Sequence, residues 1–132
     1  MTAFEHVAAR GPGSTLLLLC DHASAALPEG YGRLGLDPAL FQTHIAYDIG
    51  AESVTRQVAE LLGAPAICTR FSRLLIDPNR GLDDPTLIMR ISDGAVVPGN
   101  ACLSTANWKG ISSMPLSCEN RVSSQVLSMS QM

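Results

Sequence analysis

The chain lacks the features that mark a nucleic-acid-binding or membrane protein. It has a single Lys, its seven Arg within the first hundred residues are scattered, and its formal net charge is −3. Because phosphate binding relies on clustered basic side chains, this composition argues against a nucleic-acid partner. The longest apolar run, residues 16–20, is far shorter than the roughly 20 residues of a membrane span. With no basic segment leading into a signal-type apolar core, we expect a cytoplasmic protein.

Cysteine is sparse, and no two cysteines form a Cys-x-x-Cys pair, which argues against a zinc ribbon or a disulfide-rich scaffold. The four are Cys20, Cys68, Cys102 and Cys118. Buried free thiols are the favoured interpretation. The alternative for Cys20, next to Asp21 and His22, is a thiol nucleophile. At 132 residues and 46% hydrophobic content, the chain has room for one soluble domain with a real core.

The apolar pattern predicts strands and helices in alternation. The unbroken leucines of residues 15–20 are typical of a strand covered on both faces. Asp37 and Pro38 are a good helix start for residues 39–47. Asp48 then either caps a second helix or marks a bend in one long helix, which ends at Gly63.

Two more apolar segments follow the helices. Residues 66–69 predict a short strand, and residues 73–76 either continue it or form another. The order strand, helix, strand predicts an α/β fold with a parallel or mixed sheet and flanking helices.

The chain changes character after Asn100. The first hundred residues hold five Ser and no Lys, whereas the last thirty-two hold eight Ser and the single Lys. We therefore divide the chain into an α/β domain, residues 1–100, and an atypical tail, residues 101–132. The tail is either a disordered polar segment or a stretch translated out of frame, and its abrupt loss of pattern favours the second interpretation.

Residues 30–35 match the dinucleotide pattern G-x-G-x-x-G. That fingerprint works only where the glycines join a strand directly to a helix N-terminus. Here the predicted strand ends ten residues earlier and Pro28 intervenes. A nucleotide-binding module is therefore a minor alternative.

A first candidate site begins where the leucine run ends in Asp21 and His22. A parallel strand places such residues at the carboxyl edge of a sheet, where ligands bind in open α/β folds. The His22 ring can bind zinc while a nearby carboxylate fixes its tautomer. On a continuous helix, His44 and Asp48 would share a face, about 5 to 6 Å apart at Cβ, and could share an ion with His22. The alternatives are a hydrogen-bonded loop His22 and an N-cap Asp48.

A second candidate site is the segment D-P-N-R-G at residues 77–81. The planar fork of Arg80 matches a carboxylate, and the Asn79 amide can add a third hydrogen bond. Arg70 and Arg73 flank this corner and can draw in an anion. The alternative is a structural ion pair between Arg80 and one of its acidic neighbours, Asp77, Asp83 or Asp84. The glycine beside Arg80 permits close approach of a ligand, which favours the anion site.

Residues 14–100 resemble the N-formylglutamate amidohydrolase family, in its shorter branch. The segments that carry the resemblance are CDHASAALP, HIAYDIGA, SRLLIDPNRG and ISDGAVVPGN. It implies a zinc-carboxypeptidase-like (phosphorylase/hydrolase-like) α/β fold and a zinc or other divalent ion that activates water. The implied reaction is hydrolysis of N-formyl-L-glutamate to formate and glutamate, a last step of histidine breakdown. It also implies His22 and Asp48 as metal ligands, and Asn79 with Arg80 as the holders of the substrate carboxylate.

The chain departs from the family pattern in two ways. Ala25 stands where the motif His-Ala-Ser usually continues with Asn, and no His follows Asn100 to match the ligand that longer family members carry. A zinc hydrolase needs three protein ligands and an open position, for which only His22, His44 and Asp48 are available. Asp21 is the candidate catalytic residue, with Arg73 as a further substrate contact.

We therefore predict an incomplete amidohydrolase domain, impaired by truncation, whose substrate is a small acidic N-acyl amino acid. The alternative is an inactive fragment or an anion-binding domain without catalysis. If the missing part normally covers the sheet, the exposed sheet surface should lead the chain to form homo-oligomers or to aggregate.

Overall fold

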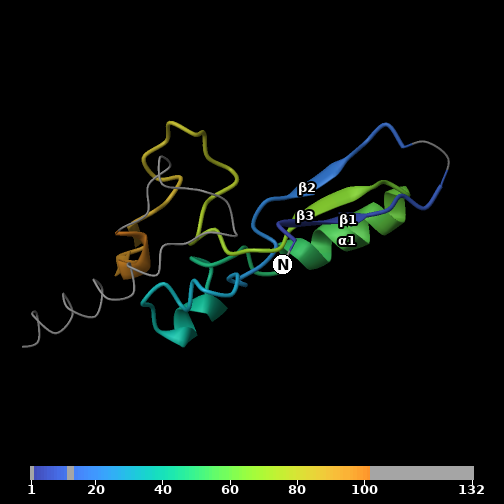
Figure 1. Ribbon diagram of the computed structural model, residues 1–132. Helices are drawn as coiled ribbons and strands as arrows, with labels where there is room; N and C mark the ends of the chain where they lie inside the picture. The colour runs from blue at the N-terminus through green and yellow to red at the C-terminus, as the bar shows by residue number, and fades with distance from the viewer. Residues whose placement is uncertain (1, 12–13, 102–132) are drawn as a thin grey trace, which may run out of the picture.

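One α-helix lies along a three-stranded sheet in the computed structural model, which describes residues 2–11 and 14–101 (Figure 1). The strands are β1 (Phe4–Val7), β2 (Leu18–Cys20) and β3 (Ala66–Thr69), in the order β1-β3-β2. β2 runs parallel to β3, and β1 runs antiparallel to it. The helix is α1 (Ala51–Leu62). We call these four elements the sheet layer. The predicted mixed α/β class is confirmed, whereas the zinc-carboxypeptidase-like arrangement stays a prediction.

The register of the sheet separates its two faces. Cys20 and Cys68 are register partners, and both pack with Ala23 and with Ala51 of α1. Because side chains alternate along a strand, the neighbouring positions point away from the helix. On that opposite face, Leu19 and His6 are both register partners of Ile67. In the part of the chain that the structure describes, α1 covers one face of the sheet layer, and Leu19 on the other face is exposed.

The rest of the chain is built mainly of turns. It contains the short 3-10 helices η1 (Pro38–Gln42) and η2 (Pro98–Asn100) and the two-stranded hairpin β4 (Ile91–Ser92) and β5 (Ala95–Val96). We call residues 25–49 and 71–101 the loop body. Its buried core cluster is Tyr31, Leu34, Leu36, Ile45, Ala46, Leu74, Leu75, Met89 and Val97. The larger hydrophobic core thus lies outside the sheet layer.

Buried polar groups hold the turns of the loop body together. The Ser72 hydroxyl donates to the Ala46 carbonyl at 2.8 Å and accepts from the Leu74 N–H. The Asn100 amide donates to the carbonyl oxygens of Leu74, at 2.6 Å, and Met89, at 2.8 Å. These side chains pair with buried backbone groups that, in a sheet, would bond to a neighbouring strand. Such pairing is needed because a buried backbone group without a partner is costly.

Several predicted elements are confirmed. The strand at residues 66–69 forms as β3, and α1 ends at Gly63, which adopts the left-handed conformation with φ 60°. Cys20 and Cys68 are buried free thiols, which argues against a nucleophilic Cys20. Cys102, Cys118 and nearly all of the predicted tail lie outside the described residues.

The predicted strand at residues 73–76 is wrong. This segment forms turns, in which the Leu75 N–H donates to the Ser72 carbonyl and both Leu74 and Leu75 are buried. The Ser72 hydroxyl accepts a hydrogen bond from the Leu74 N–H, so this backbone group bonds locally and not to a neighbouring strand. The β2 strand is also shorter than predicted, and its Leu19 is exposed, so it is not covered on both faces.

The predicted helix at residues 39–47 is wrong as well. η1 ends at Gln42, and the Thr43 hydroxyl donates to the Leu40 carbonyl and closes the turn. The α-helix starts only at Ala51, with Gly50 as the N-cap in the left-handed conformation. Asp48 therefore neither continues a helix nor caps one with its side chain.

The glycine-rich segment at residues 30–35 also lacks the context for nucleotide binding. It forms turns, and its three glycines all have positive φ. It follows no strand directly and leads into the short η1. In the described ranges, no helix has the length and apolar character needed to cross a membrane.

Candidate functional site

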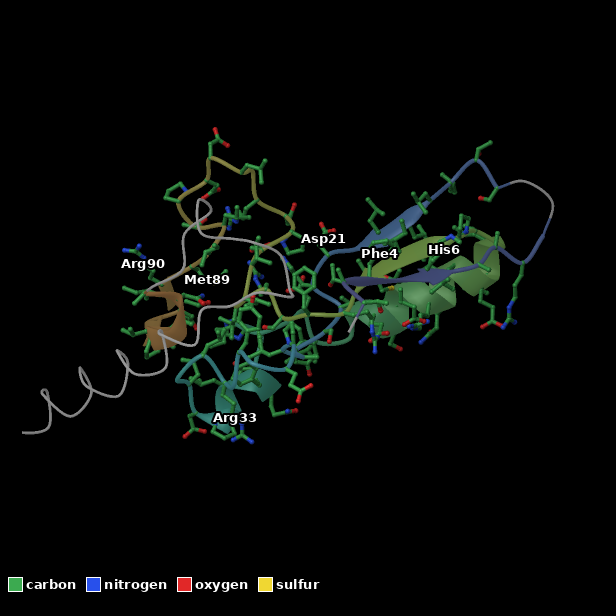
Figure 2. The ribbon with its side chains drawn as sticks, viewed as in Figure 1. Phe4, His6, Asp21, Arg33, Met89 and Arg90 are labelled. Atoms are coloured by element: carbon green, nitrogen blue, oxygen red, sulfur yellow. The ribbon has the colours of Figure 1, made fainter. Side chains whose placement is uncertain are left out.

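The site lies where β2 leaves the sheet layer and enters the loop body. Figure 2 shows Asp21 at this junction. The Thr69 hydroxyl, at the end of β3, donates to the Asp21 carbonyl at 2.6 Å and accepts from the Ala23 N–H at 3.2 Å. His22 is thus fixed from both sides by one side chain. The His22 carbonyl also accepts a hydrogen bond from the Asp48 N–H, at 3.0 Å.

The buried His22 ring stands between two carboxylates. Its Nε2 lies 2.6 Å from Asp77 Oδ1, and its Nδ1 lies 3.3 Å from Asp48 Oδ2. A neutral imidazole has one donor and one acceptor nitrogen, while an ionised carboxylate only accepts. In a neutral ring, the short contact to Asp77 favours the tautomer with the proton on Nε2, in which the Nδ1 lone pair faces Asp48, whereas a protonated ring donates to both carboxylates.

Asp77 is the central acidic residue of the cluster and only 1% exposed. Its Oδ2 accepts from Arg73 at 2.9 Å, and its Oδ1 also accepts the Asn79 N–H at 3.0 Å. Burial raises the pKa of the Asp77 carboxyl, but hydrogen bonds from His22 and Asn79 and the charges of His22 and Arg73 outweigh it. The net pKa is lowered, so Asp77 is an anion at neutral pH.

Two arginines complete this arrangement. Arg73 Nη1 lies 3.5 Å from Asp48 Oδ1, so its guanidinium spans both carboxylates. Arg80 Nε lies 3.7 Å from Asp77 Oδ2, its Nη1 lies 3.7 Å from Asp84, and its side chain is 45% exposed. We call His22, Asp48, Arg73, Asp77 and Arg80 the histidine–carboxylate cluster.

The structure therefore brings together most of the predicted site residues. His22 and Arg80 come from segments far apart in the chain and both contact Asp77. The structural ion-pair alternative for Arg80 is also present, in its long contacts to Asp77 and Asp84. Asn79 contacts the cluster through its backbone N–H. Asp21 is held by its carbonyl, next to His22.

Two residues that the sequence analysis assigned to a candidate site, His44 and Arg70, do not contact the cluster. The His44 ring is 70% exposed and pairs with Asp93 at 3.3 Å. Its expected position depended on a continuous helix to Asp48, and that helix ends at Gln42. Arg70 pairs with Glu52 at 3.2 Å and Glu5 at 3.4 Å in the sheet layer, so its charge is already compensated there.

The residues present fit part of a metal site. In residues 2–11 and 14–101, no group of three or more His, Cys, Asp or Glu side chains is arranged to hold a metal ion. His22 and Asp48 nevertheless have a suitable spacing. Two ligand atoms on a tetrahedral zinc with bonds of about 2.0 to 2.1 Å lie about 3.3 Å apart. The Nδ1 to Oδ2 distance is 3.3 Å.

Sequence reasoning missed Asp77 as a site residue, although it named Asp77 as a possible partner of Arg80. One local signal was available. Asp followed by Pro-Asn favours a turn in which the carboxylate accepts the N–H two residues later, and the Asn79 N–H makes this bond. The contact to His22 joins residues 55 positions apart, so only the fold reveals it.

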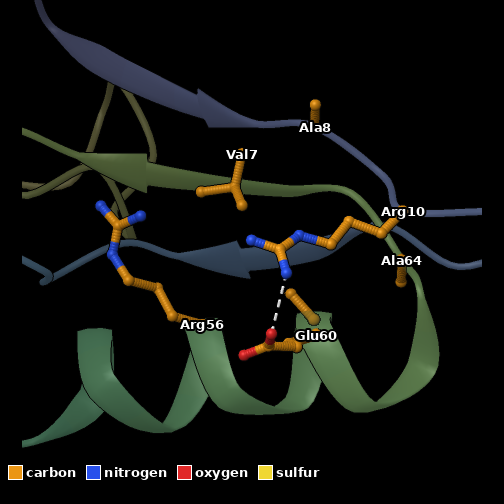
Figure 3. Close-up of a pocket in the computed structure, with 7 residues that line it drawn as sticks. Val7, Ala8, Arg10, Arg56, Glu60 and Ala64 are labelled. Atoms are coloured by element: carbon orange, nitrogen blue, oxygen red, sulfur yellow. Dashed lines mark hydrogen bonds and ion pairs between the residues drawn. The ribbon is translucent and has the colours of Figure 1, made fainter.

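A pocket between β1 and α1 is a less suitable candidate. It is lined by Val7, Ala8, Arg10, Arg56, Ala59, Glu60 and Ala64 (Figure 3). The Arg10 guanidinium is paired with Glu60 at 2.9 Å, and Arg56 is paired with Glu5 and Glu52. No histidine lines this pocket, and its cations are compensated.

Two comparisons with known proteins, one with family models and one with solved structures, found matches. Residues 14–124 match the model of a family described as N-formylglutamate amidohydrolase. The fold is similar to the crystal structure of a gene product from Agrobacterium tumefaciens, with 38% identity and a TM-score of 0.70. The similarity covers 79% of this chain and 41% of that one, so the chain spans about two fifths of its solved relative. A search of curated proteins found no significant match.

Proposed function

The chain belongs to the N-formylglutamate amidohydrolase family, and we propose that its histidine–carboxylate cluster is part of a metal-dependent amidohydrolase site. The proposed reaction removes a formyl or similar acyl group from the nitrogen of an acidic amino acid. The observation that carries the proposal is the buried His22 ring, held by Asp77 on one nitrogen and facing Asp48 on the other.

His22 and Asp48 are the residues that would hold zinc or another divalent ion. The short contact from Asp77 to Nε2 supports this role, because a carboxylate on the second ring nitrogen orients a metal-binding histidine and raises its basicity. When bound, such an ion polarises the amide carbonyl and lowers the pKa of a bound water. We assign proton transfer to Asp21, which precedes His22 in the chain and whose backbone the Thr69 hydroxyl fixes at the site.

Arg80 is the residue we propose for the acidic group of the substrate. Arg73 lies 2.9 Å from Asp77 and is mostly buried, so its main part is to hold Asp77 and Asp48 in place. Arg80 is more exposed, and its contacts to acidic residues are longer, at 3.7 Å. Its guanidinium can therefore turn to a substrate carboxylate at small cost, with the Asn79 amide adding a hydrogen bond.

The activity of this chain is expected to be impaired. A hydrolytic zinc site ordinarily has three protein ligands, and within the described residues His22 and Asp48 supply two. The alternative function is an anion-binding domain without catalysis. It is favoured by two features: Arg80 is 45% exposed with only long contacts to Asp77 and Asp84, and Arg73 already bridges the two carboxylates, Asp48 and Asp77.

Zinc binding tests the proposal. The purified chain would be titrated with zinc by calorimetry at neutral pH, and hydrolysis of N-formyl-L-glutamate would be assayed alongside. We expect His22→Ala to abolish specific binding, and Asp77→Asn to weaken it by about 10- to 100-fold through loss of the orienting carboxylate. His44→Ala is the matched control, since His44 pairs with Asp93 outside the cluster.

Each result bears on one function. Zinc affinity that is equal in the wild type, His22→Ala and His44→Ala would overturn the metal site. Glutamate binding that is lost in Arg80→Ala, without zinc binding, would support the anion-binding alternative.

A further inference from the structure

The turn of the β4–β5 hairpin consists of two residues, Asp93 and Gly94. Ser92 and Ala95 are the last register partners of the two strands, so nothing else lies in the turn. Both turn residues have positive φ, 47° at Asp93 and 80° at Gly94, as two-residue hairpin turns of the I′ type require. No other Asp in the sequence is followed by Gly. The hairpin therefore presents one Asp-Gly dipeptide in a tight turn.

An Asp-Gly dipeptide can close a ring within its own backbone. A bond between the Gly94 nitrogen and the side-chain carboxyl carbon of Asp93 completes a five-membered cyclic imide, a succinimide. A side chain on the residue after Asp would hinder this attack, whereas Gly has no Cβ. A Cβ built on Gly94 would meet no atom of the described residues within 4 Å, apart from its chain neighbours. The Asp93 side chain is 71% exposed, so water can reach and open such a ring.

His44 lies at the group that would react. Its Nε2 is 3.3 Å from Asp93 Oδ2, and the two residues come from segments far apart in the chain. The fold, and not the local sequence, therefore places an imidazole at this carboxylate. Ring closure has to expel one carboxylate oxygen as water, which requires protons on that oxygen. Histidine is the side chain that most often supplies a proton to a reacting group.

We propose that Asp93 is a site of isoaspartate formation and that His44 is the catalytic proton donor for this modification. The Gly94 nitrogen bonds to the Asp93 Cγ and gives up its proton, and the His44 imidazolium gives a second proton. Both protons leave with one carboxylate oxygen as water. Water then opens the succinimide: attack at the side-chain carbonyl restores Asp, and attack at the backbone carbonyl gives isoaspartate. Either opening regenerates the N–H, a carboxylate and one proton, which returns to His44, so the net change is an isomerisation.

Isomerisation would change the hairpin. In isoaspartate the main chain passes through the side-chain carbons, so the turn gains one backbone carbon and no longer matches the register of β4 and β5. The hairpin is closed by the Val97 N–H, which donates to the Arg90 carbonyl at 2.8 Å, and Val97 belongs to the buried core cluster of the loop body. The modification should therefore loosen the hairpin next to this core. Neither Asp93 nor His44 belongs to the histidine–carboxylate cluster, so the inference is independent of the proposed function.

Ageing of the purified full chain tests the modification. The protein would be incubated for weeks at neutral pH and physiological temperature. Isoaspartate would be measured by enzymatic methylation and located by peptide mapping in the mass spectrometer. We expect isoaspartate at position 93, preceded by a form that is lighter by one water, and none at the other aspartates. Asp93→Glu should abolish the signal, because its longer side chain would have to close a six-membered ring.

Histidine variants test the proton donor. His44→Gln keeps a hydrogen-bonding side chain but has no proton to transfer. It should slow isoaspartate formation about tenfold, which is less than a positioned acid contributes in an enclosed active site, because the pair is exposed. His6→Gln is the matched control, since His6 lies on β1 of the sheet layer. Both histidines are exposed, so neither change should unfold the chain, and circular dichroism would verify this.

Two outcomes would overturn the inference. The first is an aged chain without isoaspartate at position 93, when the same chain aged in urea forms it, which would show that the folded hairpin prevents ring closure. The second is a rate in His44→Gln that equals or exceeds the wild-type rate. It would show that His44 restrains the carboxylate of Asp93 and does not activate it.

Discussion

The sheet layer and the loop body differ in a way that runs against expectation. The sheet layer holds the regular strands and the α-helix, yet its buried cluster is only Cys20, Ala23 and Cys68. The loop body is mostly turns, yet it buries the larger core, including Leu74 and Leu75. Regular secondary structure and burial are therefore supplied by different parts of this chain. Since burial of apolar area is the main stabilising term, the loop body should contribute most of the stability.

The histidine–carboxylate cluster depends on both regions. His22 follows β2 of the sheet layer, whereas Asp77 belongs to the loop body, and their side chains lie 2.6 Å apart. Any change that loosens one region relative to the other should disturb this contact.

The largest expected effect contrasts a leucine from each region. Leu74→Ala in the loop body should destabilise the chain by about 2 to 5 kcal/mol, because it removes a fully buried side chain and leaves a cavity. Leu19→Ala in the sheet layer should change stability by less than about 0.5 kcal/mol, since Leu19 is largely exposed. Urea denaturation followed by circular dichroism measures both. Equal losses would show that the sheet layer has more cover in solution than the described residues provide.

The second effect concerns the contact between the regions. Asp77→Asn should cost about 1.5 to 3 kcal/mol at neutral pH, since it weakens hydrogen bonds made to a charged acceptor. The pKa of Asp77 is lowered, with burial opposing the shift and the bonds from His22 and Asn79 causing it. The Asp77 contribution is therefore present above its ordinary pKa of about 4 and is lost as pH falls through the lower folded value.

The pH dependence separates this prediction from a general loss of packing. Between neutral pH and about pH 2, wild-type stability should fall more than that of Asp77→Asn. Asp83→Asn, a change at a neighbouring acid whose carboxylate makes no ion pair in the described part of the chain, is the control. Parallel acid profiles for the wild type and Asp77→Asn would contradict the assignment.

The third effect tests how the sheet layer positions His22. Thr69→Val removes the hydroxyl that bonds the backbone on both sides of His22, while it keeps the shape of the side chain. We expect a loss of about 1 kcal/mol, the net value of a typical hydrogen bond. The His22 ring resonances in NMR spectra should shift as well. Thr86→Val, at an exposed threonine bonded to Asp84, should leave those resonances unchanged.

The same contrast explains which features could be predicted from the sequence. β3 and the end of α1 at Gly63 follow from local rules, an apolar run and a left-handed glycine. The turns at residues 73–76 could not be predicted, because apolar residues there pack into a core without a strand ladder. The Ser72 hydroxyl accepts the Leu74 N–H locally, but its own position depends on the tertiary hydrogen bond to the Ala46 carbonyl.

Most members of the candidate site were predictable from the sequence, but the central role of Asp77 and the geometry of the site were not. The sequence predicted two candidate sites, one at the strand end that carries His22 and one at the turn that carries Arg80. The contact of each with Asp77 depends on how the loop body folds against the sheet layer. His44 shows the converse case. Its spacing to Asp48 suggested proximity, but Thr43 and Gly50 interrupt the helix that the spacing requires.

The smallest expected effect examines whether charges compensate for the small core of the sheet layer. Arg56 lies 2.8 Å from both Glu5 of β1 and Glu52 of α1, and it is partly exposed. Arg56→Met keeps most of the stem and should cost about 0.2 to 1 kcal/mol, because exposed ion pairs gain little in water. The loss should shrink further in 1 M salt, where the Debye length is about 3 Å. A loss above about 2 kcal/mol in urea denaturation, unchanged by salt, would mean that these two ion pairs and not burial secure α1 to the sheet. The sheet layer and the loop body would then contribute similarly to stability, the sheet layer through ion pairs and the loop body through apolar burial.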